Sequence, residues 1–158
     1  MGRNIVVLDL GCGTWCRGDI GIDLDFWSRN PFDDPHRFDP LVGGYRADCI
    51  KVMSDLNLGI PIRSSSVDKV IMRDVLEHLE CPLKTLREVF RVLRPGGVLV
   101  VTVPNAMVSL ADARDETHIY SFTPYTIRRL IEKAGFRIEL VEIVFNKESI
   151  LVVASKPL

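Results

Sequence analysis

Short runs of apolar residues, separated by stretches rich in glycine, proline and charge, recur along the chain and predict the strands of a buried sheet. Strands are predicted at 4–9 and 98–103, where residues 5–8 and nearly all of 98–103 are apolar, which is typical of parallel strands buried on both faces. Shorter runs predict further strands at 20–22, 49–53 and 69–72. The last two runs, 136–145 and 149–155, flank an Asn-Lys turn and predict a closing antiparallel pair.

Two segments change to the helical period and predict helices over 82–93 and 124–134. Pro82 and Pro124 suit the first helical position, because proline lacks the N–H that a first turn leaves unbonded. Thr123 can cap the second helix. A Pro-Gly-Gly run is expected to end the first helix, and a single glycine the second.

The connections between the first three predicted strands lack any convincing helix. Residues 14–19 are too few for the helix that normally joins two parallel strands. Residues 26–47 contain three prolines, two adjacent glycines and no helical period, which indicates a long irregular segment. Its aromatic residues favour order. They could cover bare sheet, or form a lid that orders when a ligand binds.

Length and charge indicate one domain over residues 1–158, with a net charge of −1. This balance argues against a general attraction to nucleic acid or to a membrane surface. No apolar run reaches the ~18 residues of a membrane span, and a core strand stands where a signal peptide would, so we expect a cytoplasmic location. The cysteines lack a second pair or a histidine cluster at zinc-site spacing, so we expect free thiols and no metal.

The most informative stretch is the end of the first strand, where Asp9 is followed by Gly11-Cys12-Gly13. A strand that leads into Gly-x-Gly lets backbone approach a nucleotide-like ligand. This turn resembles motif I of the class I S-adenosylmethionine (SAM) dependent methyltransferases, and in particular the methyltransferase type 11 group. The resemblance continues, in the family's order, through Gly21-Ile22-Asp23, Ser54-Asp55, Ser66-Val67-Asp68, Leu76-Glu77-His78-Leu79, Arg91-Val92-Leu93-Arg94-Pro95-Gly96-Gly97 and Thr117-His118-Ile119-Tyr120.

The resemblance implies a Rossmann-like α/β fold with a mostly parallel sheet and an antiparallel last strand. Here that fold is reduced, because the helices between strands one, two and three are missing or rudimentary. It also implies SAM as cofactor and S-adenosylhomocysteine as product. Asp9 matches the acid that holds the methionine amino group, Asp23 the acid at the ribose, and Asp55 the acid at the adenine. The full set of expected cofactor-binding residues is Asp9, Gly11, Gly13, Arg17, Asp23, Asp55, Leu56 and Arg73.

Three positions carry alternative interpretations. Without a helix N-terminus, Arg17 could bind the carboxylate of the cofactor, or it could be a solvated surface arginine. Asp55 could instead cap a turn. The family often has a third glycine where this chain has Trp15, which either follows from the missing helix or spoils the pocket.

The candidates for acid–base chemistry at the acceptor are His78, His118 and Tyr120, which follow the fourth and fifth strands. For His78 the favoured alternative is packing against loops with a bond to backbone. Methyl transfer depends mainly on aligning the nucleophile, the methyl group and sulfur, so the lack of an obvious base does not argue against it.

We therefore expect a SAM-dependent methyltransferase that acts on an unidentified acceptor, and we expect that acceptor to be a small molecule. The alternative is a catalytically inactive SAM-binding protein of the same fold. An NAD-dependent oxidoreductase is disfavoured, because Cys16 stands at the last position of its glycine fingerprint. Since helices would cover only one face of an apolar sheet, we also expect a two-fold homodimer over much of the other face.

Overall fold

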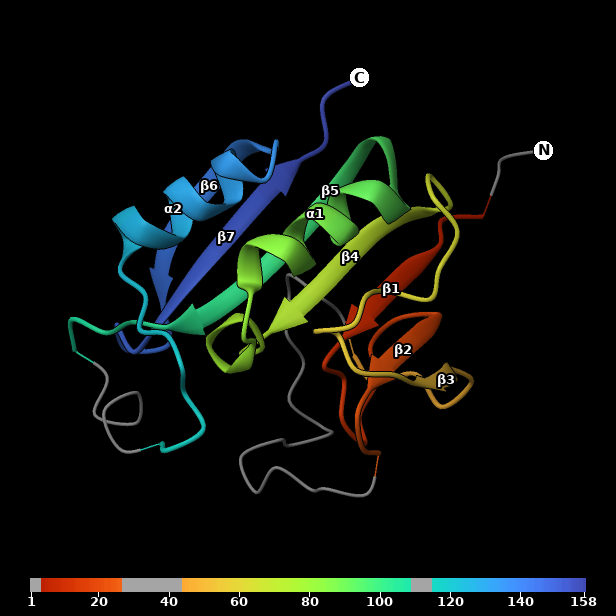
Figure 1. The fold of residues 1–158 in the computed structure, drawn as a ribbon, viewed down its shortest axis with the longest axis horizontal. Helices are drawn as coiled ribbons and strands as arrows, with labels where there is room; N and C mark the ends of the chain where they lie inside the picture. Colours follow the sequence, from red (N-terminus) through yellow and green to blue (C-terminus); the bar gives the residue numbers. More distant parts are fainter. Residues whose placement is uncertain (1–3, 27–43, 109–114) are drawn as a thin grey trace.

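The computed structural model of the chain describes residues 4–26, 44–108 and 115–158. It contains a seven-stranded sheet in the order β3-β2-β1-β4-β5-β7-β6 (Figure 1). The strands are β1 Val7–Leu10, β2 Ile20–Asp23, β3 Ile50–Met53, β4 Val67–Arg73, β5 Leu93–Pro104, β6 Arg137–Val144 and β7 Ser149–Ser155. Strands β1 to β5 pair in parallel, and β7 pairs antiparallel with both β5 and β6. The predicted Rossmann-like sheet is confirmed.

Helices α1, Pro82–Val92, and α2, Pro124–Lys133, lie on one face of this sheet (Figure 1). A 3-10 turn, η1 at Leu76–His78, follows β4. Thr123 caps α2 as predicted: its hydroxyl accepts from the backbone N–H of Thr126 at 3.2 Å. The positions of both helices agree with their hydrophobic period to within one residue.

The core lies between the helices and the sheet. It joins Leu86 and Val89 of α1 and Ile127 and Ile131 of α2 to side chains from one face of the strands. On the alternate positions, Ile71, Val100 and Leu151 form a separate small cluster on the opposite face. The two described helices therefore cover one face only, and neither is long and apolar enough to cross a membrane.

The first connection confirms the prediction of a missing helix. Residues 11–19 join β1 to β2 without one, which leaves the turn after β1 to be held by other means. Between β2 and β3 the described residues also contain no helix. Most of the 26–47 segment, including the hypotheses of an aromatic cover and of a lid, lies outside the described residues.

The Pro-Gly-Gly run behaves differently from the expectation. Helix α1 ends at Val92, and β5 begins at once with Leu93, so the run lies inside the strand. The pairing with β4 jumps there, from Val67 opposite Leu93 to Lys69 opposite Val98. Backbone pairing on both sides of the run keeps these residues in the strand, with an irregular register.

Candidate functional site

A pocket of about 460 Å³ lies at the carboxyl ends of β1, β2 and β4, where parallel sheets of this kind bind ligands. All eight residues expected to bind the cofactor line it. Its lining comprises Asp9, Gly11, Cys12, Gly13, Arg17, Asp23, Leu24, Ser54, Asp55, Leu56, Asn57, Arg73, Asp74, Val75, His78 and Leu79. Segments far apart in the sequence thus meet around one cavity.

The two glycines of the turn serve different purposes. Both adopt positive φ, +67° at Gly11 and +53° at Gly13, which disfavours any residue with a Cβ. A Cβ on Gly11 would lie 2.3 Å from Cγ2 of Val75, so this glycine lets the turn pack against the end of β4. A Cβ on Gly13 would meet nothing within 4 Å, so this glycine leaves open space at the pocket wall.

Backbone N–H groups orient the Asp23 carboxylate at the end of β2. One oxygen accepts from Gly13 at 2.7 Å, and the other accepts from Asp25 at 3.2 Å. A carboxylate has about four acceptor positions, so both oxygens can still accept from ligand hydroxyls. At the end of β1, the buried Asp9 carboxylate accepts from the backbone N–H of Arg17 at 2.7 Å.

Two arginines reach the pocket. Arg17 is only 9% exposed, so the interpretation as a solvated surface arginine is wrong. Its Nη1 donates to the carbonyl of Trp15 at 3.3 Å. Arg73, at the end of β4, has a buried Nε with no hydrogen-bond partner within the described part of the chain. A buried unbonded donor of a cationic group is costly, and an anionic ligand would satisfy it.

Asp55 combines the two roles considered for it. Its Oδ1 accepts from the backbone N–H of Asn57 at 2.8 Å, so it caps a turn, and the residue also lines the pocket. Leu56 beside it is nearly buried, and its carbonyl accepts from the Thr85 hydroxyl at 3.3 Å. The turn therefore holds both residues in place at the pocket wall.

The three acid–base candidates are not equally placed. His78 lines the pocket, and its Nδ1 lies 3.0 Å from the Thr117 hydroxyl. His118 does not line it but lies beside His78, with ring centroids 4.7 Å apart. The Tyr120 hydroxyl donates to the carbonyl of Glu80 at 3.0 Å, and Tyr120 is not among the described residues that line the pocket.

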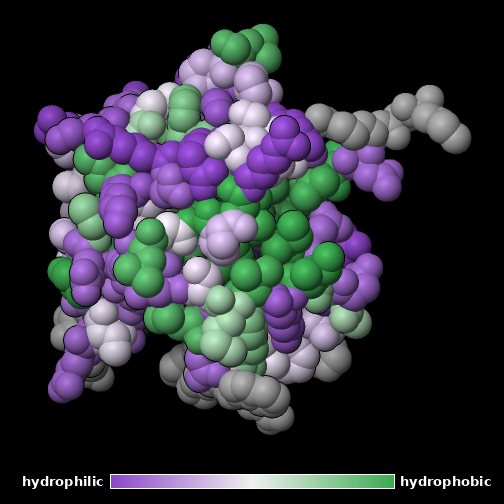
Figure 2. Space-filling model, turned by 45° about the vertical axis from the view of Figure 1, so that its right-hand side comes forward, coloured by the Kyte–Doolittle hydropathy of each residue, from purple (hydrophilic) through white to green (hydrophobic). Residues whose placement is uncertain are grey.

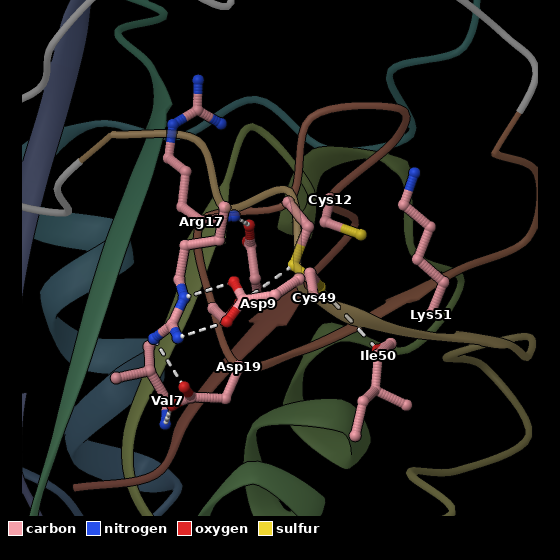
Figure 3. The surroundings of a disulfide bond; sticks show 12 residues. Val7, Asp9, Cys12, Arg17, Asp19, Cys49, Ile50 and Lys51 are labelled. Atoms are coloured by element: carbon pink, nitrogen blue, oxygen red, sulfur yellow. Dashed lines mark hydrogen bonds and ion pairs between the residues drawn. A yellow bond between two sulfur atoms is a disulfide. The ribbon is translucent and has the colours of Figure 1, made fainter.

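A disulfide joins Cys16 to Cys49, which corrects the expectation of four free thiols. Cys12 and Cys81 are free. Figure 3 shows Cys12, Asp9 and Arg17 gathered around the disulfide. The sequence spacing did not indicate this pairing, because the two sulfurs meet only after β3 pairs beside β2.

Hydrogen bonds, together with the disulfide, hold the 11–19 turn in place. Asp19 accepts from the backbone N–H of Val7 at 2.7 Å and from the Arg46 guanidinium at 2.5 Å. Lys51 of β3 donates to the carbonyl of Thr14 at 3.0 Å. These bonds and the disulfide hold a turn that in most such folds would be the start of a helix.

Cys12, Leu24 and Asn57 line the pocket but were not expected there from the sequence. Burial, followed by the charges of Asp9 and Asp23, raises the pKa of the Cys12 thiol to about 12, so it stays neutral near pH 7. The position of Cys12 between the two glycines of the turn could have indicated that it lines the pocket. Asp74 adopts a positive φ of 52° directly after β4, a strained conformation of the kind found at ligand sites. Nothing in the sequence pattern indicated that Leu24 and Asn57 would line the pocket.

Comparison with known proteins agrees with this geometry. A family model described as a methyltransferase domain matches residues 2–141. A protein of Mycolicibacterium smegmatis named "Probable S-adenosylmethionine-dependent methyltransferase" is 37% identical over 150 residues, covering 84% of this chain and 52% of the relative. The malonyl-[acyl-carrier protein] O-methyltransferase of Dechloromonas aromatica is 32% identical over 142 residues, covering 82% of this chain and 50% of the relative.

The fold has solved counterparts as well. The crystal structure of a SAM-dependent methyltransferase from Mesorhizobium loti superposes with a TM-score of 0.68 at 16% identity, covering 96% of this chain and 91% of that one. The chain spans about half the length of the curated relatives it matches. The ordered motifs, the sheet and the family match agree, and the chain belongs to the family of S-adenosylmethionine-dependent methyltransferase domains.

Proposed function

We propose that this domain binds SAM in the pocket at the ends of β1, β2 and β4 and directs its methyl group to an oxygen atom of a small-molecule acceptor. The observation that carries the proposal is the convergence of the eight expected cofactor-binding residues, drawn from four parts of the chain, on one cavity. The cofactor supplies the chemistry, an activated methyl group on a sulfonium. The chain supplies binding and alignment.

Three acidic residues would bind three parts of the cofactor: the ribose, the adenine and the methionine amino group. Asp23, already oriented by two backbone N–H groups, would accept from the ribose hydroxyls. Asp55 and Leu56, held by their turn, would contact the adenine. The buried Asp9 would hold the methionine amino group, which offsets the cost of burying a carboxylate.

Arg73 and Arg17 would bind the carboxylate of the cofactor. The unbonded Nε of Arg73 supports this assignment, because a carboxylate would give it a partner. Arg17 lies at the same pocket. Since no helix begins after β1, these guanidiniums would replace the N–H groups and dipole that a helix N-terminus would offer.

An oxygen acceptor is supported by the Dechloromonas aromatica relative, which is named an O-methyltransferase. His78, the one imidazole among the lining residues, marks the acceptor side of the pocket, with His118 next to it. The net charge of −1 supports a small acceptor rather than a nucleic acid.

The test is calorimetry with S-adenosylhomocysteine. Asp23→Ala should weaken binding by about 1–3 kcal/mol, because hydrogen bonds to a charged carboxylate are lost. Glu142→Gln, an exposed acid on β6, is the matched control and should bind like the parent. NAD should not bind. Equal affinity of Asp23→Ala and parent would overturn the site, and binding without turnover on any oxygen acceptor would favour the inactive SAM-binding alternative.

We also propose a two-fold homodimer. Figure 2 shows hydrophobic side chains gathered in a patch bordered by hydrophilic ones, on the side of the molecule where β1 to β3 lie in Figure 1. Exposed apolar residues here are Ile5, just before β1, and Ile50 and Met53 of β3, at 71%, 65% and 66%. A second copy would bury such a surface. Light scattering should give twice the mass of one chain, and a monomer at micromolar concentration would contradict the dimer.

A cytoplasmic location is the remaining part of the proposal. The Cys16–Cys49 disulfide weighs against it, because reducing conditions in most cytosols disfavour disulfides. Fractionation of cells that express the protein would decide between cytosolic and exported material.

A further inference from the structure

Beside the pocket, three potential metal ligands come together. Glu77 and His78 are consecutive in η1, and His118 comes from the segment after β5. One ligand atom of each lies within 4.8 Å of the others. We propose that Glu77, His78 and His118 bind a divalent transition-metal ion, with Zn²⁺ as the first candidate, at the acceptor side of the pocket. The cysteine spacing considered in the sequence gave no hint of this site.

The segment that carries His118 is fastened to η1. The backbone N–H groups of Ile119 and Tyr120 both donate to the Glu77 carbonyl, at 2.8 and 3.1 Å. The Tyr120 hydroxyl donates to the Glu80 carbonyl at 3.0 Å. These contacts fix the two elements relative to each other, so the three side chains are brought together before any ion arrives.

Neighbouring groups set the orientation of both imidazoles. Nδ1 of His78 faces Thr117, with the hydroxyl at 3.0 Å and the carbonyl at 3.3 Å, which directs Nε2 elsewhere as the ligand atom. Asp115 lies 3.5 Å from Nε2 of His118. A carbonyl or carboxylate on the far nitrogen is the usual support of a metal-binding histidine.

The donor set suits the ion. Two imidazoles and one carboxylate are the ligands of catalytic zinc sites, which keep a fourth position open for substrate or water. Glu77 is 0% exposed, and a buried carboxylate is costly unless a positive charge lies close. A divalent ion would add a positive charge directly beside this carboxylate.

The role of the ion rests on the proposed function. Because His78 lines the pocket, an ion held there would present its open position to the acceptor. It would bind an acceptor hydroxyl and lower its pKa. The hydroxyl proton passes to water, the oxygen lone pair forms the new O–C bond, and the electrons of the broken C–S bond return to sulfur. The chain then needs no separate general base.

The test is titration of the EDTA-treated protein with Zn²⁺ in a calorimeter, at neutral pH and without cofactor. The parent should bind one ion per chain. His78→Ala and His118→Ala should each weaken binding at least tenfold, while circular dichroism shows that they stay folded. The control is Cys81→Ser, which removes an exposed free thiol that could bind Zn²⁺ by itself. This variant should bind like the parent.

A second readout keeps this inference separate from the proposed function. Glu77→Gln retains the shape of the side chain and should also lose Zn²⁺ affinity. S-adenosylhomocysteine binding is measured in EDTA for His118→Ala and Glu77→Gln, whose residues are not among the described ones that line the pocket, and it should be retained. Absence of Zn²⁺ binding to the parent, or binding that survives both histidine substitutions, would overturn the metal site even where S-adenosylhomocysteine binds normally.

Discussion

The two halves of the sheet are stabilised in different ways. The half formed by β4 to β7 has strands of 7–12 residues and lies under both helices, with a large apolar core. The half formed by β1 to β3 has strands of four residues, and no described helix covers it. It contributes Leu8, Leu10 and Ile22 to the same core, and it is also held by the Cys16–Cys49 disulfide and by carboxylates that bind backbone N–H groups.

The difference matters because the smaller half carries most of the expected cofactor residues. A segment that binds a ligand closely cannot also bury a large apolar face there. Covalent and polar links around Asp9, Asp19 and Asp23 can fix the turn after β1 without covering the pocket. We infer that burial under the helices dominates in the β4–β7 half, and that covalent and polar cross-links add to burial in the β1–β3 half. Stability and ligand affinity should therefore respond to different substitutions.

The largest effect is expected in the helical half. Leu86 of α1 is fully buried, and Leu86→Ala should lower the free energy of unfolding by about 4 kcal/mol, because a cavity remains in the core. Leu83→Ala, at a half-buried position of the same helix, should cost less. Urea denaturation measures both. S-adenosylhomocysteine affinity should be unchanged while the protein is folded, and a matching loss of affinity would break the division between the halves.

The disulfide should come next. Its cysteines are separated by 33 residues, and removing the link with Cys16→Ser and Cys49→Ser together should cost about 3 kcal/mol by freeing the unfolded chain. Ligand affinity should fall as well, because Gly13 and Arg17 lie in the fastened turn. Cys81→Ser, at an exposed free thiol, is the control. If the double variant unfolds with the same free energy as the parent, the polar contacts alone are enough to hold the turn after β1.

The two glycines of the turn offer a comparison inside the smaller half. Gly11→Ala should cost about 2–4 kcal/mol, because it adds a clash with Val75 to the strain of positive φ. Gly13→Ala should cost only the strain, about 1–2 kcal/mol. Its methyl group would project into open space at the pocket, so ligand affinity should fall. If thermal unfolding shows that Gly11→Ala and Gly13→Ala lose the same free energy of unfolding, the packing role of Gly11 is contradicted.

The smallest effect concerns the junction of the halves. Glu88 and Arg91 of α1 bind the backbone of Ile60 and Ile62, in the connection that leads from β3 to β4. The hydrogen bond from Arg91 lowers the pKa of Glu88. The folded state therefore gains stability above the ordinary glutamate pKa of about 4.3, and this gain is lost as pH falls through the lower folded value.

Glu88→Gln should thus cost about 1 kcal/mol at pH 7 and flatten the fall in stability on acidification below about pH 4.5. Urea denaturation from pH 7 to pH 3 measures the change. Glu132→Gln, in the exposed pair with Arg128 on α2, should behave like the parent. If the stability of Glu88→Gln and Glu132→Gln depends on pH in the same way, the Glu88–Arg91 junction makes no specific contribution to stability.

Local features predicted most of the architecture. The proline at each helix start, the Thr123 cap and the apolar periods placed α1 and α2 correctly, because these signals act over neighbouring residues. The prediction failed at the start of the fifth strand, because β5 begins at Leu93 and includes the Pro-Gly-Gly run, whereas the apolar pattern indicated a start at residue 98. The motif order also brought the expected cofactor residues to one pocket, as the carboxyl ends of parallel strands require.

The sequence by itself determined the strands, the helices, the glycine turn and the family, since each depends on residue order and spacing. Only the tertiary structure decided that Arg17 is buried, that Cys16 joins Cys49, and that His118 lies beside His78. Those facts depend on the approach of segments far apart in the chain. Strand pairing and the contacts between loops fix that approach, and no local pattern encodes it.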